Sequence, residues 1–256
     1  MTGFRRRALA HREPPRSADL RHPPRYLLHP LRPAARAVVR TRLDVRLHGA
    51  ENVPPSGPVI LASNHIGAVD GPVLAIFSPR PVHALTKQEM FSGAAGPFLH
   101  ASGQIRLDRF HPDPGAVKAC LGVLRDGGVV GIFPEGTRGA GDLQRLKHGA
   151  AYLALVTGAP VVPVTILGTR APGEDKYATP PRHAVIDLVY SPAWQVPAVR
   201  WPRRKEQVAE ASAALQAYLQ AAQAAALAST GRELPGPLPP GTPGADEPPD
   251  PARGAA

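Results

Sequence analysis

The sequence predicts an α/β domain in which a mixed, largely parallel sheet is flanked by helices. Short apolar runs of strand length alternate along the chain with longer runs that have helical spacing, an order typical of strand–helix–strand units. Most of the strand-like runs are apolar throughout, as expected for strands that are covered on both faces. The 256 residues are enough for one such domain with a large core.

Seven segments have the pattern of strands. The first, LDVRLHG (43–49), alternates apolar and polar residues. Six mainly apolar runs follow: PVILAS (58–63), VHALT (82–86), GQIRLD (103–108), VVGIF (129–133), PVVPVTIL (160–167) and AVIDLVY (184–190). Helices are predicted over 70–78, 115–127, 146–158 and 203–229, and the middle two end in glycine, a usual helix stop. Residues 43–228 therefore form the predicted domain.

Both ends of the chain differ from this domain in composition. Residues 1–25 are rich in arginine and proline with little to bury, so we expect a disordered basic arm. Residues 26–42 predict a basic amphipathic membrane-docking segment that is helical in its later part, with one stripe formed by Arg32, Arg36 and Arg40. Residues 229–256 are rich in proline and predict a disordered tail.

The net charge of +10 is concentrated near the N-terminus. The first 50 residues contain twelve arginines and three acidic residues, which sum to +9. Such a segment beside a nearly neutral domain favours contact with a polyanion, either anionic lipid or nucleic acid. The single cysteine, Cys120, excludes an internal disulfide and suits a reducing compartment. We see no secretory signal and no run of ~18 apolar residues, so we expect no membrane-spanning helix.

Polar residues follow the run 58–63 in the stretch SNHIGAVDGP (63–72). In a strand–loop–helix corner, a separation of five residues lets the side chains of His65 and Asp70 meet. A carboxylate on one imidazole nitrogen leaves the other nitrogen as a general base, which can deprotonate the hydroxyl of a substrate. A second interpretation stays open, in which His65 is an ordinary polar residue and Asp70 only caps the following helix.

Two further strand-like runs also end in polar residues. The run 129–133 is followed by PEGTRG (134–139), in which glycines allow close backbone approach and Thr137 and Arg138 suit a phosphate. Glu135 is expected to orient Arg138 or to accept from a substrate hydroxyl. Arg109 follows the run 103–108. Each cluster alone is equally a turn or a solvated loop, but three polar strand ends at one edge of a sheet predict a ligand site.

The order of these motifs resembles that of the glycerolipid acyltransferases, the 1-acylglycerol-3-phosphate acyltransferase family. The similar segments are NHIGAVD (64–70) to the family's NHxxxxD motif, GQIRLDR (103–109) to its second motif, FPEGTRG (133–139) to its third and VVPVTI (161–166) to its fourth. The resemblance covers about residues 45–190. It departs at Gln104 and Arg106, where the family's second motif tends to be more apolar.

The resemblance implies a glycerol-3-phosphate acyltransferase-like fold and an enzyme of phospholipid biosynthesis. Such an enzyme moves a fatty acyl group from a thioester, on coenzyme A or acyl carrier protein, to the hydroxyl of lysophosphatidate or a related lysophospholipid. His65 would be the general base and Asp70 would orient it. The acceptor's phosphate and glycerol would be held by Arg109, Glu135, Gly136, Thr137 and Arg138. Lys87 is a further candidate for contact with the phosphate or the donor, and Asn64 for steadying the loop or the developing oxyanion. We expect no metal site and no cofactor besides the thioester co-substrate.

Other functions stay open. They are an O-acyltransferase acting on glycerol 3-phosphate or another lipid, a non-catalytic anionic-lipid-binding relative, a nucleic-acid-binding protein, and a metal-dependent hydrolase. Aromatic residues make up only 5% of the chain and none is interleaved with the arginines, which argues against nucleic acid. His65 and Asp70 lack the third ligand of a catalytic zinc site. We expect a peripheral enzyme on the cytoplasmic face of the membrane, held on anionic lipid by arginines of residues 5–46.

Overall fold

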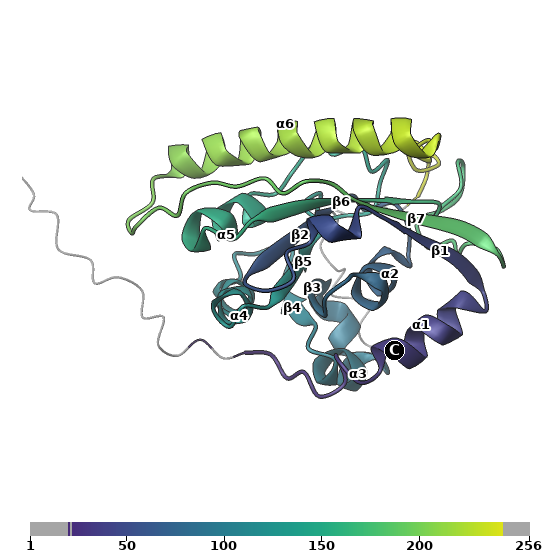
Figure 1. Ribbon diagram of the computed structural model, residues 1–256, viewed down its shortest axis with the longest axis horizontal. Helices are drawn as coiled ribbons and strands as arrows, with labels where there is room; N and C mark the ends of the chain where they lie inside the picture. Colours follow the sequence, from purple (N-terminus) through teal and green to yellow (C-terminus); the bar gives the residue numbers. More distant parts are fainter. Residues whose placement is uncertain (1–19, 21, 243–256) are drawn as a thin grey trace, which may run out of the picture.

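A seven-stranded sheet forms the centre of the computed structural model, which describes residues 20 and 22–242 (Figure 1). The strands are β1 (Leu43–His48), β2 (Val59–Ser63), β3 (Val82–Lys87), β4 (Ile105–Leu107), β5 (Val129–Ile132), β6 (Val161–Leu167) and β7 (Ala184–Tyr190). Their spatial order is β1-β7-β6-β2-β5-β3-β4, and all neighbours pair in parallel except β6 and β7. The predicted mixed, largely parallel sheet is confirmed, and the strands from β6 to β4 have their carboxyl ends at one edge.

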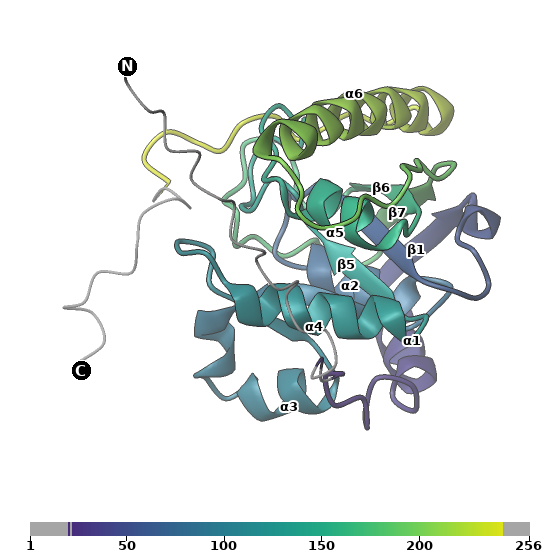
Figure 2. The ribbon, with the colours of Figure 1, turned by 90° about the vertical axis from the view of Figure 1, so that its left-hand side faces the viewer.

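Helices cover both faces of this sheet (Figures 1 and 2). One face packs against α4 (Pro114–Arg125), α5 (Gly149–Thr157) and α6 (Lys205–Thr230), and the other against α1 (Arg32–Arg40) and α2 (Asp70–Phe77). Three short elements have no counterpart in the predicted helices: η1 (Ala50–Asn52), η2 (Gln88–Phe91) and α3 (Gly96–Ala101). They are too short to show a helical period. Among the described residues, no helix combines the length and apolar character needed to cross a membrane.

The central strand β2 explains why the strand-like runs are apolar throughout. Every residue of β2 is buried, and successive side chains enter different cores. Ile60 packs in the core under α4, α5 and α6, whereas Leu61 packs in the core on the α2 side. Full burial of one such side chain contributes about 1.5–3 kcal/mol. Cys120 of α4 lies in the same core as Ile60 and is 1% exposed, and burial raises the pKa of its thiol to about 12.

The arginine stripe of α1 points toward the protein. Arg36 donates from Nε to the carbonyl of Ile76 (2.8 Å) and from Nη2 to that of Ser78 (2.8 Å), and Arg32 donates to the same Ser78 carbonyl. Arg40 lies over the ring of Phe77, 5.4 Å from its centroid. These carbonyls at the end of α2 lack helical partners, so cationic donors stabilise them. The sequence predicts that these arginines contact anionic lipid. In the structure, carbonyls at the end of α2 accept from Arg32 and Arg36, so they compete with lipid for these two guanidinium groups.

Parts of both predicted disordered ends make defined contacts. His22, in the predicted arm, packs edge-on against the ring of the buried His83. At the other end, α6 runs to Thr230, and the segment 231–242 returns to the domain, where Arg232 pairs with Asp187 (3.1 Å). Such long-range arginine contacts leave no local sequence pattern, so composition alone predicts disorder there. The rest of both ends, residues 1–19, 21 and 243–256, lies outside the described residues.

Candidate functional site

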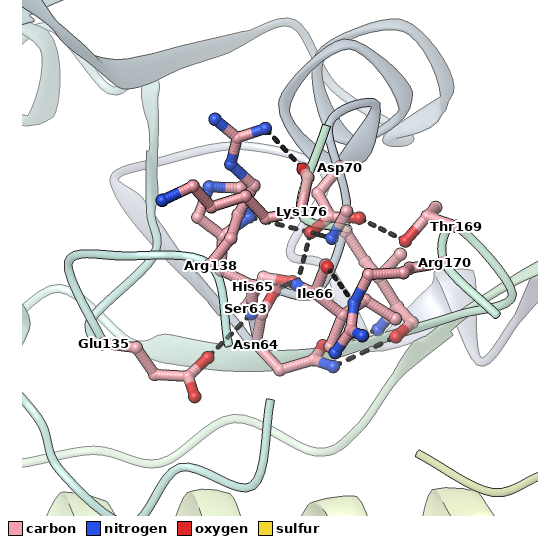
Figure 3. Close-up of polar contacts among 12 residues, drawn as sticks. Ser63, Asn64, His65, Ile66, Asp70, Glu135, Arg138, Thr169, Arg170 and Lys176 are labelled. Atoms are coloured by element: carbon pink, nitrogen blue, oxygen red, sulfur yellow. Dashed lines mark hydrogen bonds and ion pairs between the residues drawn. The ribbon is translucent and has the colours of Figure 1, made fainter. Parts of the chain in front are cut away.

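The first polar cluster lies at the carboxyl end of β2, in the loop that leads to α2 (Figure 3). Nδ1 of His65 and Oδ2 of Asp70 are 2.7 Å apart. Asp70 is the first residue of α2, and its carboxylate turns back into the loop, where it accepts from the backbone N–H groups of Ile66 (2.7 Å) and Gly67 (2.8 Å). The N-cap position belongs to Val69. The carboxylate therefore fixes the loop and the imidazole, and it does not cap the helix.

Complete burial of Asp70 makes its hydrogen bonds necessary. The side chain is 0% exposed, and a buried carboxylate is costly unless its oxygens are hydrogen-bonded. Oδ1 accepts from the hydroxyl of Thr169, which lies just beyond β6 and is also 0% exposed. Because both carboxylate oxygens are engaged, Asp70 cannot rotate away from His65. The loop has no room for a larger residue at Gly67, where a Cβ would lie 2.6 Å from the carbonyl oxygen of Thr169.

The imidazole of His65 is held in place but remains accessible. It stacks on Phe133, with ring centroids 4.2 Å apart, and the side chain is 21% exposed. The contact with Asp70 assigns the ring proton to Nδ1. Within the described part of the chain, Nε2 of His65 has no hydrogen-bond partner. The geometry therefore presents an unprotonated ring nitrogen to a ligand, which is the arrangement of a general base.

The third motif holds the backbone of His65. Glu135 accepts from the backbone N–H of His65 through Oε2 (2.7 Å) and from that of Leu143 through Oε1 (3.4 Å), while the N–H of Gly139 donates to the carbonyl of His65 (3.0 Å). Glu135 was expected to orient Arg138 or to contact substrate, and its carboxylate is instead bonded to these backbone groups. Burial raises the pKa of Glu135 to about 7, and the two backbone hydrogen bonds partly oppose that shift.

Arg109 connects the second motif to the third. Its Nη1 donates to the carbonyl of Gly136 (3.3 Å), and no residue of the described chain accepts from its buried Nε. Gly136 has a φ of +74°, which favours glycine, and the side chain of Lys147 lies 3.3 Å from where its Cβ would be. Glu135, the neighbour of Gly136, bonds to His65, so the structure brings the guanidinium to the same edge as the imidazole. An unsatisfied buried N–H there is a donor for an anionic ligand.

Arg138 belongs to the third motif, as does Gly136, the residue that Arg109 contacts, but Arg138 has different partners. Its Nη1 donates to the carbonyl of Lys176 (2.7 Å), and its guanidinium lies 4.8 Å from the ring centroid of Tyr177. Thr137 makes only a long contact, 3.5 Å from its hydroxyl to the carbonyl of Arg138. These contacts orient the outer half of the third motif toward residues 176–177, a segment that the sequence analysis did not connect with the site.

Of the two further candidates, Asn64 has a structural role and Lys87 makes no hydrogen bond or ion pair with the His65–Asp70 cluster that the described residues show. The amide of Asn64 is 1% exposed and bonds twice to the backbone of Ile166, at 3.0 Å as donor and 2.7 Å as acceptor. It therefore holds β2 against β6 and is not available to an oxyanion. Lys87 is the last residue of β3. In the described part of the chain, no hydrogen bond or ion pair joins Lys87 to the cluster.

Arg170 is a central residue that the sequence analysis missed. It is 3% exposed, and it donates to the carbonyls of Ile66 (2.8 Å), Gly139 (2.8 Å) and Gly236 (2.7 Å). It thus ties the first motif, the third motif and the C-terminal segment together. Thr169 and Arg170 follow the apolar run 160–167 after one glycine, so the signal that identified Arg109, a polar residue after a buried strand, was also present here.

Three comparisons relate this geometry to known proteins. The sequence model of the Acyltransferase family matches residues 44–167, which include all four motifs. The chain is 34% identical over 137 residues to a 1-acyl-sn-glycerol-3-phosphate acyltransferase of Bacillus subtilis, an alignment that covers 53% of this chain and 68% of the relative. It is 35% identical over 135 residues to the protein of the same name from Borreliella burgdorferi, covering 50% of this chain and 52% of that one.

A solved structure shares the fold. The 1-acyl-sn-glycerophosphate acyltransferase PlsC of Thermotoga maritima superimposes with a TM-score of 0.55 over 80% of each chain, at 22% identity. Within the described residues, no group of three or more His, Cys, Asp or Glu side chains is placed to hold a metal ion.

The raised pKa of Glu135 predicts a pH-dependent effect of Glu135→Gln on stability. The folded state raises this pKa from 4.5 to about 7, so ionisation costs stability progressively as pH rises through that window. The cost approaches about 3 kcal/mol above the folded pKa. Relative to wild type, the Gln variant should therefore gain free energy of unfolding from about pH 5 to about pH 8, measured by urea denaturation.

The matched control is Glu51→Gln, because Glu51 is an exposed carboxylate at the far end of the sheet. Its difference from wild type should not change with pH. A difference in free energy of unfolding between Glu135→Gln and wild type that is the same at every pH has no bearing on the prediction. The prediction concerns how this difference changes with pH. If that difference is the same at both ends of the range, Glu135 is not protonated in the folded state as described.

Proposed function

The chain belongs to the acyltransferase family, and we propose that it transfers a fatty acyl group from a thioester to the hydroxyl of lysophosphatidate, in phospholipid biosynthesis. The observation that carries this proposal is the His65–Asp70 pair, whose open imidazole nitrogen lies at the same sheet edge as Arg109. A base for a hydroxyl and a cation for a phosphate are the two groups that this acceptor requires. The relatives from Bacillus subtilis and Borreliella burgdorferi are named for the same chemistry.

The proposed reaction is a direct transfer. Nε2 of His65 takes the proton of the acceptor hydroxyl as its oxygen attacks the thioester carbonyl carbon. The new C–O bond forms, the C–S bond then breaks, and the leaving thiolate takes the proton back from His65. Asp70 keeps the imidazole in the required tautomer and stabilises its transient positive charge. General-base catalysis of this kind contributes roughly 10²–10⁴ in rate.

Arg109 is proposed to bind the acceptor's phosphate. Among the described residues, its buried Nε has no hydrogen-bond partner, and Arg109 lies next to the loop that holds His65. Arg138 adds positive charge at this edge, and the third-motif residues Gly136 and Thr137 shape the loop between the two arginines. Glu135 is proposed to act on the acceptor indirectly, by fixing the backbone of His65.

The activity is tested with radiolabelled acyl-CoA against a panel of lysophospholipids and glycerol 3-phosphate. Wild type should acylate lysophosphatidate, and His65→Gln should lower kcat by at least about 100-fold, because the base is lost. Arg109→Gln should instead raise the KM for the acceptor about 10-fold or more, because a charge-assisted hydrogen bond to phosphate is lost.

His100→Gln is the matched control for the histidine, since His100 is exposed on α3. It should keep wild-type rates. Circular dichroism should show that His65→Gln is folded. Wild-type transfer by folded His65→Gln protein would disprove the base assignment, and an unchanged acceptor KM in Arg109→Gln would disprove the phosphate contact.

Thr169 is proposed as a positioning residue for the same reaction. Thr169→Val keeps the shape but leaves Oδ1 of Asp70 without its donor, so His65 should lose its fixed orientation. We expect kcat to fall about 10- to 100-fold, corresponding to about 1–3 kcal/mol, with both KM values little changed. Thr169→Ser retains the hydroxyl and should restore most of the rate. Equal losses in the Val and Ser variants would mean that packing, and not the hydrogen bond, is what matters.

We further propose that the enzyme works on the membrane surface, at its cytoplasmic face, where acceptor and acyl chain reside. The support is an apolar surface on and before α1, where Tyr26 is 80%, Leu31 39% and Val38 67% exposed. This surface lies opposite the arginines that bind the end of α2. Apolar side chains of this kind insert into the headgroup region, and arginines elsewhere in residues 5–46 add attraction to anionic lipid.

Flotation with vesicles containing phosphatidylglycerol tests this docking surface. The double variant Tyr26→Asp/Val38→Asp should float at least about 10-fold less than wild type, because charged side chains do not insert. Leu47→Asp on β1 is the control, since Leu47 is also an exposed apolar residue (36%) but lies on another element. Equal flotation of wild type and the double variant would exclude the α1 surface as the contact.

A further inference from the structure

A cationic pocket lies where α5 and α6 begin. Its volume is about 410 Å³. Figure 1 shows the start of α6 above α5, and the two helices pack against each other. The lining residues come from the first turn of α5, from the first turn of α6 and from the segment before α6: His148, Tyr152, Trp201, Arg203, Arg204, Lys205, Val208 and Ala209. We name this the α5–α6 pocket.

The charge of the α5–α6 pocket is of one sign. Arg203, Arg204 and Lys205 are consecutive cations, and no carboxylate is among the lining residues. Within the described part of the chain, no acidic side chain forms an ion pair with Arg203 or Lys205. The Nε of Arg203 is buried and has no hydrogen-bond partner in residues 20 and 22–242. An unpaired buried guanidinium N–H is costly, and a bound anion would satisfy it.

The remaining lining residues are aromatic and apolar. Tyr152 and Trp201 contribute rings, Trp201 is 40% exposed, and Val208 adds an aliphatic surface. Rings stack on flat heterocycles, and a concave site of several hundred Å³ holds a molecule much larger than a phosphate ion. The combination of cations with aromatic rings therefore fits a phosphorylated nucleotide, which has both a planar base and anionic groups.

The α5–α6 pocket adjoins the loop of the third motif. His148, which lines the pocket, directly follows Lys147, whose backbone N–H donates to the carbonyl of Pro134 (2.7 Å). The side chain of Lys147 packs over Gly136, the residue whose carbonyl accepts from Arg109. The pocket residue His148 is thus the neighbour of a residue that packs on the third motif, which places the pocket beside this loop.

We propose that the α5–α6 pocket binds the nucleotide end of a coenzyme A thioester, with Arg203, Arg204 and Lys205 at the phosphates and the two rings at the adenine. The inference rests on the proposed acyl transfer, which requires a thioester donor. It commits to coenzyme A as the donor because a concave, ring-lined site suits a base and phosphates. A carrier protein would present a broad acidic surface and has no need of such a site.

Calorimetric titration with adenosine 3′,5′-bisphosphate tests the proposal on the full chain without turnover. Wild type should bind it, and Arg203→Gln/Lys205→Gln should bind at least about 10-fold more weakly, because two charge-assisted contacts are lost. Lys118→Gln/Arg182→Gln removes the same charge from exposed positions on other elements and should bind as wild type does. Absence of binding by wild type, or equal weakening in both double variants, would overturn the proposal.

Steady-state kinetics distinguish binding of the donor's nucleotide from binding of its pantetheine and acyl chain. In Arg203→Gln/Lys205→Gln, the KM for palmitoyl-CoA should rise about 10-fold with kcat little changed. The KM for palmitoyl-pantetheine, which lacks the nucleotide, should stay as in wild type. A variant that is impaired only with palmitoyl-acyl carrier protein would assign the pocket to an acidic protein and overturn the inference. Nucleotide binding without any acyl transfer would contradict the proposed function alone.

Discussion

The buried carboxylate of Asp70 is the interaction on which the arrangement of the site depends. It accepts from the backbone of Ile66 and Gly67, from the ring of His65 and from the hydroxyl of Thr169. An anion removed from water needs this many donors, so the loop after β2 must fold around it and β6 must end beside it. The electrostatic requirement of one side chain thus links two strand ends that are about 100 positions apart in the sequence.

The sheet could be predicted from the sequence because burial on both faces makes each strand a continuous apolar run between turn signals, as in β2 and β6. The meeting of His65 with the third motif followed from the rule that parallel strands end at one edge. What each polar side chain contacts did not follow. Asn64 forms hydrogen bonds with the backbone of Ile166, and Glu135 with the backbone N–H of His65. Unpaired backbone groups at strand ends compete with a ligand for such side chains. Those partners are set by three-dimensional packing.

Several arginines of this basic chain stabilise the fold from within. Arg80 donates to the carbonyls of Pro54, Gly57 and Gly127, and Arg170 donates to carbonyls of four different residues. A guanidinium with five fixed donors is suited to joining loops whose carbonyls point together. Net charge alone therefore overstates the positive surface available to a polyanion. Arg109, the proposed phosphate ligand, keeps a buried N–H for which the described residues supply no acceptor.

The buried thiol of Cys120 has a chemical consequence for the proposed transfer of an acyl group from a thioester. Thioesters exchange readily with any thiolate that can reach them, and the thiolate is the reactive form. Burial in the core beside α4 raises the pKa of the chain's one thiol to about 12, which disfavours self-acylation at sulfur. The alcohol of the second substrate is then left without a competing nucleophile of this type, so the acyl group is not diverted onto the protein's own sulfur.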